Sequence, residues 1–241
     1  NTGNAAFTGR IGSDELNVTS ANGAFADKNA GDGKAVNIGN IVLGGADAGN
    51  YALASTTATT SADIAKASIS GVTGITAQNR TYDGTTDASL NTASAGFSGR
   101  FGNDELSVTS ATGAFADKNA GTAKSVAITG ITLGGADAGN YVLASDTSST
   151  QVDISKAALT ITAADASKVA GQGITLNGYS TRGLVAGDSV VSVSLTSSGE
   201  PTSAAAGTYA IVASDASGAD LSNYAIQYEE GALLVTAAPS E

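Results

Sequence analysis

The stretch Gly45-Ala46-Asp47-Ala48-Gly49-Asn50-Tyr51 occurs three times along the chain. The same seven residues return at 135–141, and the third version, at 218–224, reads Gly-Ala-Asp-Leu-Ser-Asn-Tyr. Gly, Asp and Asn favour a turn that tolerates positive φ, and each copy leads from its Tyr into an alternating apolar run. The motif therefore predicts a turn-to-strand corner in three places.

The corner motif belongs to a longer repeat of 90 residues. Residues 1–70 and 91–160 align without a gap, and 45 of the 70 pairs are identical. A period of 90 is too long for a solenoid unit and matches one small sandwich domain. In an immunoglobulin-like sandwich, a Tyr at such a corner bonds through its hydroxyl to an upstream backbone group. We therefore expect Tyr51, Tyr141 and Tyr224 to bury their rings and make this bond.

The predicted fold is all-β, with tandem immunoglobulin-like β-sandwich modules forming an elongated rod. We place the modules at 1–68, 69–157 and 158–241, because the junctions are short and carry no flexible linker. Residues 71–90 give the second module an opening strand that has no counterpart before Asn1, so the first module is expected to lack it and the parent chain to be longer. Alternation of apolar residues with Ser and Thr predicts the strands of the third module, at 159–161, 174–176, 191–195, 209–211 and 233–235.

Composition removes most catalytic chemistry. The 241 residues include no Cys, no Met and no His, which excludes disulfides, thiol nucleophiles and the commonest zinc ligand. The formal net charge of −11 disfavours nucleic acid and anionic lipid as partners, and no apolar run reaches transmembrane length. The first residues do not resemble a signal peptide. We expect no enzymatic activity, no catalytic residue, no cofactor and no bound metal.

Two acidic pairs, Asp14-Glu15 and Asp104-Glu105, suggest paired carboxylates. Neighbours on a strand point to opposite faces, so a solvated loop is the better interpretation. Single aspartates in the corner motifs suggest calcium, which needs several carboxylates close together, and one per loop is sparse for this; these are Asp47, Asp137 and Asp220.

The loops Asp27-Lys28-Asn29 and Asp117-Lys118-Asn119 allow two interpretations. One is a local turn with an ion pair. The other is an intramolecular Lys–Asn isopeptide bond, which needs an acid buried beside both partners. Asn50 and Asn140 suit the role of acceptor in such a bond, and they suit equally well a role as turn residues.

The remaining candidates are better explained by structure than by binding. Gly44-Gly45 lacks the strand–loop–helix context and the Lys of a phosphate-binding loop. Tyr82 and Tyr179 are candidates for a ligand site, but core or corner packing is the preferred interpretation of each.

The first two modules resemble the YDG repeat, which is named for a Tyr-Asp-Gly that stands here as Tyr82-Asp83-Gly84. The third is similar to the related MBG (mostly bacterial Ig-like) domain, through the stretches at 183–188, 207–209, 223–224 and 231–235. Such domains occur in tandem arrays of large secreted bacterial adhesins, filamentous-haemagglutinin-like and exported by two-partner secretion. The resemblance implies a Gram-negative cell surface and carries no catalytic residue.

This resemblance implies a stalk or spacer role in cell adhesion or biofilm formation. The partners expected are neighbouring repeats of the same chain and, through other domains of the parent protein, a host or matrix ligand. The alternative is a module that itself binds a glycan, a matrix polymer or another copy of the adhesin. Because the two long repeats are most alike in their loops, the sequence favours the spacer.

Overall fold

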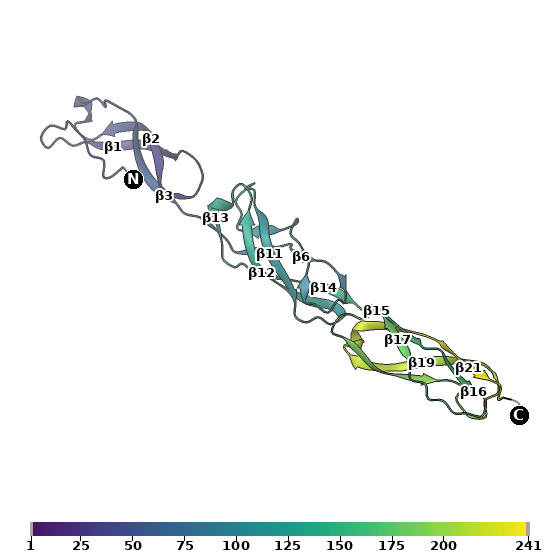
Figure 1. Cartoon of the computed structure of the whole chain (residues 1–241). Helices are drawn as coiled ribbons and strands as arrows, with labels where there is room; N and C mark the ends of the chain where they lie inside the picture. The colour runs from purple at the N-terminus through teal and green to yellow at the C-terminus, as the bar shows by residue number, and fades with distance from the viewer. Residues whose placement is uncertain (1, 240–241) are drawn as a thin grey trace. The chain divides into compact units, whose positions relative to one another are not determined.

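The computed structural model describes residues 2–239 of the chain, and the fold of these residues is all-β, as expected (Figure 1). Their only helical elements are three 3-10 turns of three residues each, η1 (Ala48–Asn50), η2 (Ala138–Asn140) and η3 (Leu221–Asn223). None of the described helical elements has the length and apolar character needed to cross a membrane.

The contacts divide the chain into two compact units. The first comprises residues 1–73, 95–109 and 132–146, and the second comprises residues 74–94, 110–131 and 147–241. The second sequence repeat thus contributes to both units. The module boundaries at 68 and 157 stay a prediction.

The first unit contains one sheet and two short strand pairs. The sheet is antiparallel, in the order β1-β2-β3, and consists of β1 (Asn17–Phe25), β2 (Gly31–Gly44) and β3 (Ala58–Ile64). β4 (Ala67–Ile69) pairs in parallel with β13 (Tyr141–Leu143). β5 (Gly71–Thr73) pairs in antiparallel with β10 (Gly96–Ser98), so that Val72 stands opposite Phe97.

The strands of the second repeat continue into the second unit. A five-stranded sheet has the order β7-β14-β12-β11-β8 and is formed by β7 (Arg80–Thr81), β14 (Ser148–Ser155), β12 (Gly121–Gly134), β11 (Ser107–Phe115) and β8 (Asp87–Ala88). The short strands β6 (Thr76–Ala77) and β9 (Leu90–Asn91) form a separate pair. Residues 71–88 thus pair as four short strands with the rest of this repeat, which confirms that they open it.

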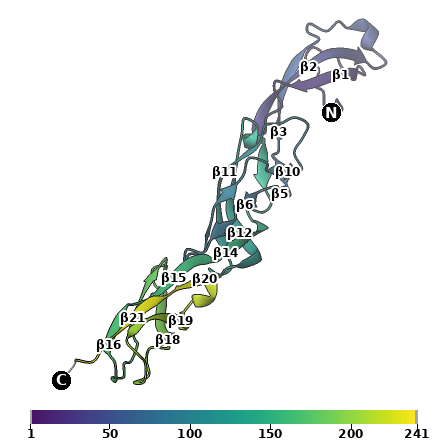
Figure 2. The ribbon, with the colours of Figure 1, turned by 90° about the vertical axis from the view of Figure 1, so that its right-hand side faces the viewer.

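The third repeat consists of two sheets that share one core (Figure 2). One has the order β17-β15-β20 and the other β16-β21-β19-β18; their strands are β15 (Ala157–Ala163), β16 (Ala166–Val169), β17 (Tyr179–Arg182), β18 (Ser189–Thr196), β19 (Gly207–Ala219), β20 (Tyr224–Glu229) and β21 (Gly231–Thr236). Alternate residues of three of these strands meet in a buried cluster: Ala163, Ile211, Ala213, Leu233 and Val235. Period-two alternation with one buried face is the pattern expected of such strands.

Two expected strands are not formed. Residues 174–176 are not a strand, although Ile174 and Leu176 pack against the buried cluster. Residues 51–53 are also irregular, whereas their counterparts 141–143 form β13. The difference has a physical reason: β13 pairs with β4 of the preceding junction, and a strand requires such a hydrogen-bonding neighbour.

The first and second repeats differ in burial although they share most of their sequence. None of the described residues up to 68 is buried, while the second repeat has a core. Phe25 is 39% exposed and its counterpart Phe115 only 4%. Other pairs in which the first member is half-buried and the second buried are Val36 and Val126, Ile38 and Ile128, Ile41 and Ile131, and Ile64 and Ile154. The same side chains are thus packed only in the repeat that has strands from residues 71–88.

Candidate functional site: the clasp between consecutive repeats

The corner Tyr of every repeat fixes its own turn. The hydroxyl of Tyr141 accepts a hydrogen bond from the backbone N–H of Phe101 at 3.0 Å and donates one to Asp104 Oδ2 at 2.7 Å. Tyr224 bonds in the same way to Val185 N (2.8 Å) and Asp188 Oδ2 (2.6 Å), and Tyr51 to Ile11 N (3.0 Å) and Asp14 Oδ2 (2.5 Å). The expected bond to an upstream backbone group is therefore confirmed in all three repeats. Burial of the ring is confirmed for Tyr141 and Tyr224, whereas Tyr51 is half-buried.

The aspartate bonded to each corner Tyr was missed as a structural residue. The sequence favoured a solvated loop for Asp14 and Asp104, yet the side chain of Asp104 is only 17% exposed and accepts two hydrogen bonds. The bond from Lys28, followed by the bond from Tyr141, lowers the pKa of Asp104. The fixed interval between this aspartate and the corner Tyr, 37 residues in the first two repeats, is the signal that pointed to the pair.

Lys28 connects the first repeat to the corner of the second. Its Nζ lies 2.5 Å from Asp104 Oδ1 and 2.9 Å from Asp137 Oδ1. These two carboxylates raise the pKa of Lys28, and Lys28 in turn lowers the pKa of Asp137. The Lys28 side chain is 63% exposed, so solvent and salt screen this ion pair and it directs the contact more than it stabilises it.

Two amide hydrogen bonds accompany the ion pair. The backbone N–H of Ala30 donates to Asn140 Oδ1 at 2.8 Å, and Asn140 Nδ2 donates to Asn29 Oδ1 at 3.2 Å. Asn140 belongs to η2, the 3-10 turn of the second corner motif. We call the set of Lys28, Asn29 and Ala30 with Asp104, Asp137 and Asn140 the first clasp.

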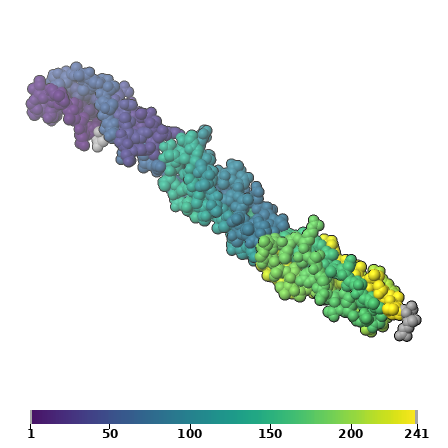
Figure 3. All heavy atoms as spheres, viewed as in Figure 1, coloured from purple at the N-terminus to yellow at the C-terminus, as the bar shows by residue number. Residues whose placement is uncertain are grey.

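The same arrangement, the second clasp, joins the second and third repeats. Lys118 Nζ lies 2.8 Å from Asp220 Oδ2 and 3.7 Å from Asp188 Oδ1. Ala120 N donates to Asn223 Oδ1 at 2.9 Å, and Asn223 Nδ2 donates to Asn119 Oδ1 at 3.2 Å. Asn223 is only 1% exposed, so its amide has no access to water in place of these partners. In the space-filling view, the atoms of the second repeat meet those of the third without a gap (Figure 3).

Tyr82, the tyrosine of the Tyr-Asp-Gly motif, is part of the second clasp. Its ring is 3% exposed and packs edge-on against Tyr224, with centroids 5.5 Å apart. Its hydroxyl donates to Asp188 Oδ2 at 2.9 Å, and Lys118 Nζ lies 6.0 Å from the ring centroid. The expectation that Tyr82 packs is confirmed, but its partners belong to the next repeat. Tyr179, the other candidate, is half-buried and donates to Val190 O at 3.3 Å.

The Asp-Lys-Asn loop is shaped by its own aspartate. Asp27 Oδ1 accepts from the backbone N–H of Asn29 at 2.8 Å and binds Lys34, and Asp117 does the same with Asn119 and Lys124. The interpretation as a local turn with an ion pair is therefore correct for the aspartate. The lysine that follows it points to the next repeat, where its partners are aspartates and not an asparagine acceptor of a cross-link.

The remaining candidates stay apart. Asp47 Oδ2 accepts from Glu15 N and Asp137 Oδ2 from Glu105 N, both at 2.8 Å, which closes each turn. Asp220 is engaged by Lys118. Within residues 2–239, no three acidic side chains gather as metal ligands. The paired acids of the sequence therefore serve turns and clasps.

Tyr224 should titrate far above an ordinary tyrosine. Burial, and then the hydrogen bond to Asp188, raise its pKa to about 12. A pKa raised in the folded state contributes stability that is complete below the unfolded value of about 10 and is lost as pH rises through about 12. Two pH units correspond to about 2–3 kcal/mol. Tyrosinate absorbance of the parent minus that of Tyr224→Phe should give this late titration, and a difference midpoint near 10 would contradict the geometry.

Comparison with protein families agrees with this geometry. The model of the YDG domain matches residues 1–60 and 65–149, and the model of the MBG domain (YGX type) matches residues 159–234. No curated protein and no solved structure matches the chain significantly. The matched segments follow the repeats that the corner motif and the clasps delimit. The chain belongs to the YDG domain family and carries an MBG domain of the YGX type as its third repeat.

Proposed function

We propose that this chain is a structural stalk or spacer segment of a large bacterial adhesin, on the cell surface or secreted. The observation that carries the proposal is the clasp, which recurs with the same Lys, Asn and Ala at both junctions. A contact repeated between successive repeats suits a segment that transmits position and load along an array. YDG and MBG domains are consistent with adhesin-type modules.

In this proposal the repeats are immunoglobulin-like sandwiches. Support comes from the two sheets and single core of the third repeat and from the Tyr corner that all three share. The segment supports adhesion or biofilm formation outside a Gram-negative cell, reached by two-partner secretion, and the chain catalyses no reaction. Its partners are neighbouring repeats, while other domains of the parent protein bind the host or matrix.

Small-angle scattering of the chain in solution tests this proposal. A spacer should give the profile of an extended particle, and weakening both clasps with Asn140→Ala and Asn223→Ala should broaden the distance distribution. Each of these asparagines ends a 3-10 turn at a junction, so the matched control is Asn37→Ala, which replaces a residue of β2 instead. A compact profile of the parent chain would rule out the spacer.

A further inference from the structure

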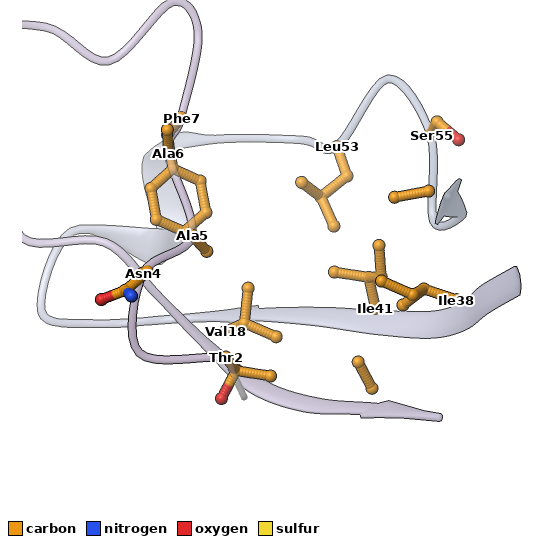
Figure 4. A pocket seen from close by; sticks show the side chains of 12 residues that line it. Thr2, Asn4, Ala5, Ala6, Phe7, Val18, Ile38, Ile41, Leu53 and Ser55 are labelled. Carbon is orange, nitrogen blue, oxygen red and sulfur yellow. The ribbon is translucent and has the colours of Figure 1, made fainter. Parts of the chain in front are cut away.

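The first repeat has an open apolar groove. Its cavity of about 360 Å³ lies over the β1–β2 sheet, between the irregular residues 2–7 and the loop at 53–58 (Figure 4). The side chains that point into it are mostly aliphatic or aromatic, and they include Phe7, Val18, Ile38, Ile41 and Leu53. A groove of this composition favours an apolar occupant.

In the second repeat, the counterparts of this groove are packed. Ile128 and Ile131, which correspond to Ile38 and Ile41, are 0% and 3% exposed. The second repeat differs by having Val72 and Ile75, each 4% exposed, on the extended segment that begins with β5. β5 pairs with β10, where Phe97 corresponds to Phe7 of the groove. The extended segment is therefore what the groove of the first repeat lacks.

A second cavity of about 240 Å³ lies beside the first clasp. Its lining includes Lys28, Asp104 and Tyr141, together with apolar side chains such as Ile64 and Phe101. The corresponding residues of the second clasp are Lys118, Asp188 and Tyr224, and they surround the buried ring of Tyr82. Tyr82 lies at the far end of the same extended segment that carries Val72 and Ile75. One segment therefore supplies what both cavities lack.

The side chain between these two points supports the same occupant. The Arg80 guanidinium lies 4.9 Å from the ring centroid of Phe115, which is 4% exposed. Its counterpart Phe25 is 39% exposed. An aliphatic pair, an arginine and a tyrosine at the spacing of Val72, Ile75, Arg80 and Tyr82 thus match an apolar groove, an exposed ring and a polar cavity in order.

We propose that the first repeat binds an extended opening strand of the YDG type, with the sequence pattern of residues 71–83. The strand adds to the edge of the repeat by backbone hydrogen bonds, its aliphatic side chains fill the groove, and its tyrosine donates to Asp104 at the first clasp. The occupant is a segment of another repeat of this family. This binding site is independent of the spacer proposal, because strand addition serves a ligand-binding module equally well.

The test joins a copy of residues 71–90 to the N-terminus of the full chain, which keeps the 90-residue spacing. Hydrogen exchange, measured by mass spectrometry on peptides of β1 and β2, should slow at least about tenfold, since burial of two aliphatic side chains is worth at least that factor. Exchange in the third repeat serves as the internal reference and should not change.

Variants of the added copy separate this site from a general effect of a longer chain. Val72→Asp with Ile75→Asp in the copy should abolish the slowing, and Tyr82→Phe should reduce it near Asp104 only. Thr73→Glu with Thr76→Glu, at exposed positions of the same segment, should leave it intact. Unchanged exchange in β1 and β2 on adding the copy, or equal slowing by the aspartate variant, would overturn the proposal.

Discussion

Gly135→Ala should destabilise the chain by about 2–4 kcal/mol, because the first glycine of the corner motif admits no side chain. Gly135 has a φ of +99°, and a Cβ there would lie 2.3 Å from the carbonyl oxygen of Glu105 and 2.9 Å from the Cα of Leu106. Neither obstacle is a flexible side chain, so the turn must move, and with it the bond of Asp137 to Glu105. Denaturant unfolding monitored by circular dichroism measures the loss.

The same motif contains the control. Gly139 lies four residues further on and does not have a positive φ, and a Cβ added at this position would meet no atom within 4 Å. Gly139→Ala should change the free energy of unfolding by no more than about 0.5 kcal/mol. Equal midpoints for the two variants would show that the corner does not depend on the close approach at Gly135.

Asp188→Ala should cost about 2–4 kcal/mol, since this side chain, 2% exposed, is the acceptor at the centre of the second clasp. It accepts from Tyr224 at 2.6 Å and from Tyr82 at 2.9 Å, and both rings are buried. Hydrogen bonds to a charged group contribute about 1.5–3 kcal/mol each, and relief of the buried charge offsets part of the loss. Unfolding of the third repeat, followed by module-resolved hydrogen exchange, measures the effect.

The equivalent change in the first repeat gives the matched comparison. Asp14 accepts from Tyr51, its side chain is half-buried, and no ion pair to it is found among the described residues. Asp14→Ala should therefore destabilise its repeat by less than half as much as Asp188→Ala destabilises the third. Equal losses would mean that the contacts across the junction contribute nothing to the stability of the corner.

Acid should weaken the second clasp in the same way. Burial raises the pKa of Asp188, but hydrogen bonds from Tyr224 and Tyr82 and the charge of Lys118 outweigh it, so the pKa is lowered overall. A lowered pKa contributes stability above the unfolded value of about 4 and loses it as pH falls through the folded value. The Asp188→Ala variant should lack this part of the acid sensitivity of the parent.

Much of the fold followed from local sequence. The corner motif predicted the turn, the Tyr hydroxyl bond and the upstream partner, because a glycine with positive φ and a tyrosine after a turn have few other uses. Alternation located most strands of the third repeat. It was wrong at 174–176, where apolar side chains pack without a paired backbone, and period-two alternation reports side-chain burial but not hydrogen bonding.

The clasps were beyond local pattern. Lys28 and Asp104 are 76 residues apart, and Ala30 and Asn140 are 110 apart, so neither pair shares a strand, a turn or a periodicity. The sequence showed only that Gly-Ala-Phe-Ala-Asp-Lys-Asn-Ala-Gly is unchanged at 23–31 and 113–121. An exposed loop identical in two repeats is a sign of a common partner, and here that partner is the corner of the next repeat.

Amide exchange at Ala30 and Ala120, resolved by nuclear magnetic resonance, tests most directly that these clasps join consecutive repeats. Each N–H donates to an asparagine of the next repeat, at 2.8 and 2.9 Å. Both should be protected in the parent chain; Asn223→Ala should release Ala120 and leave Ala30 protected, and Asn140→Ala should do the reverse. Exchange of both amides at the rate of an open loop in the parent, or their release by either variant alike, would contradict the account.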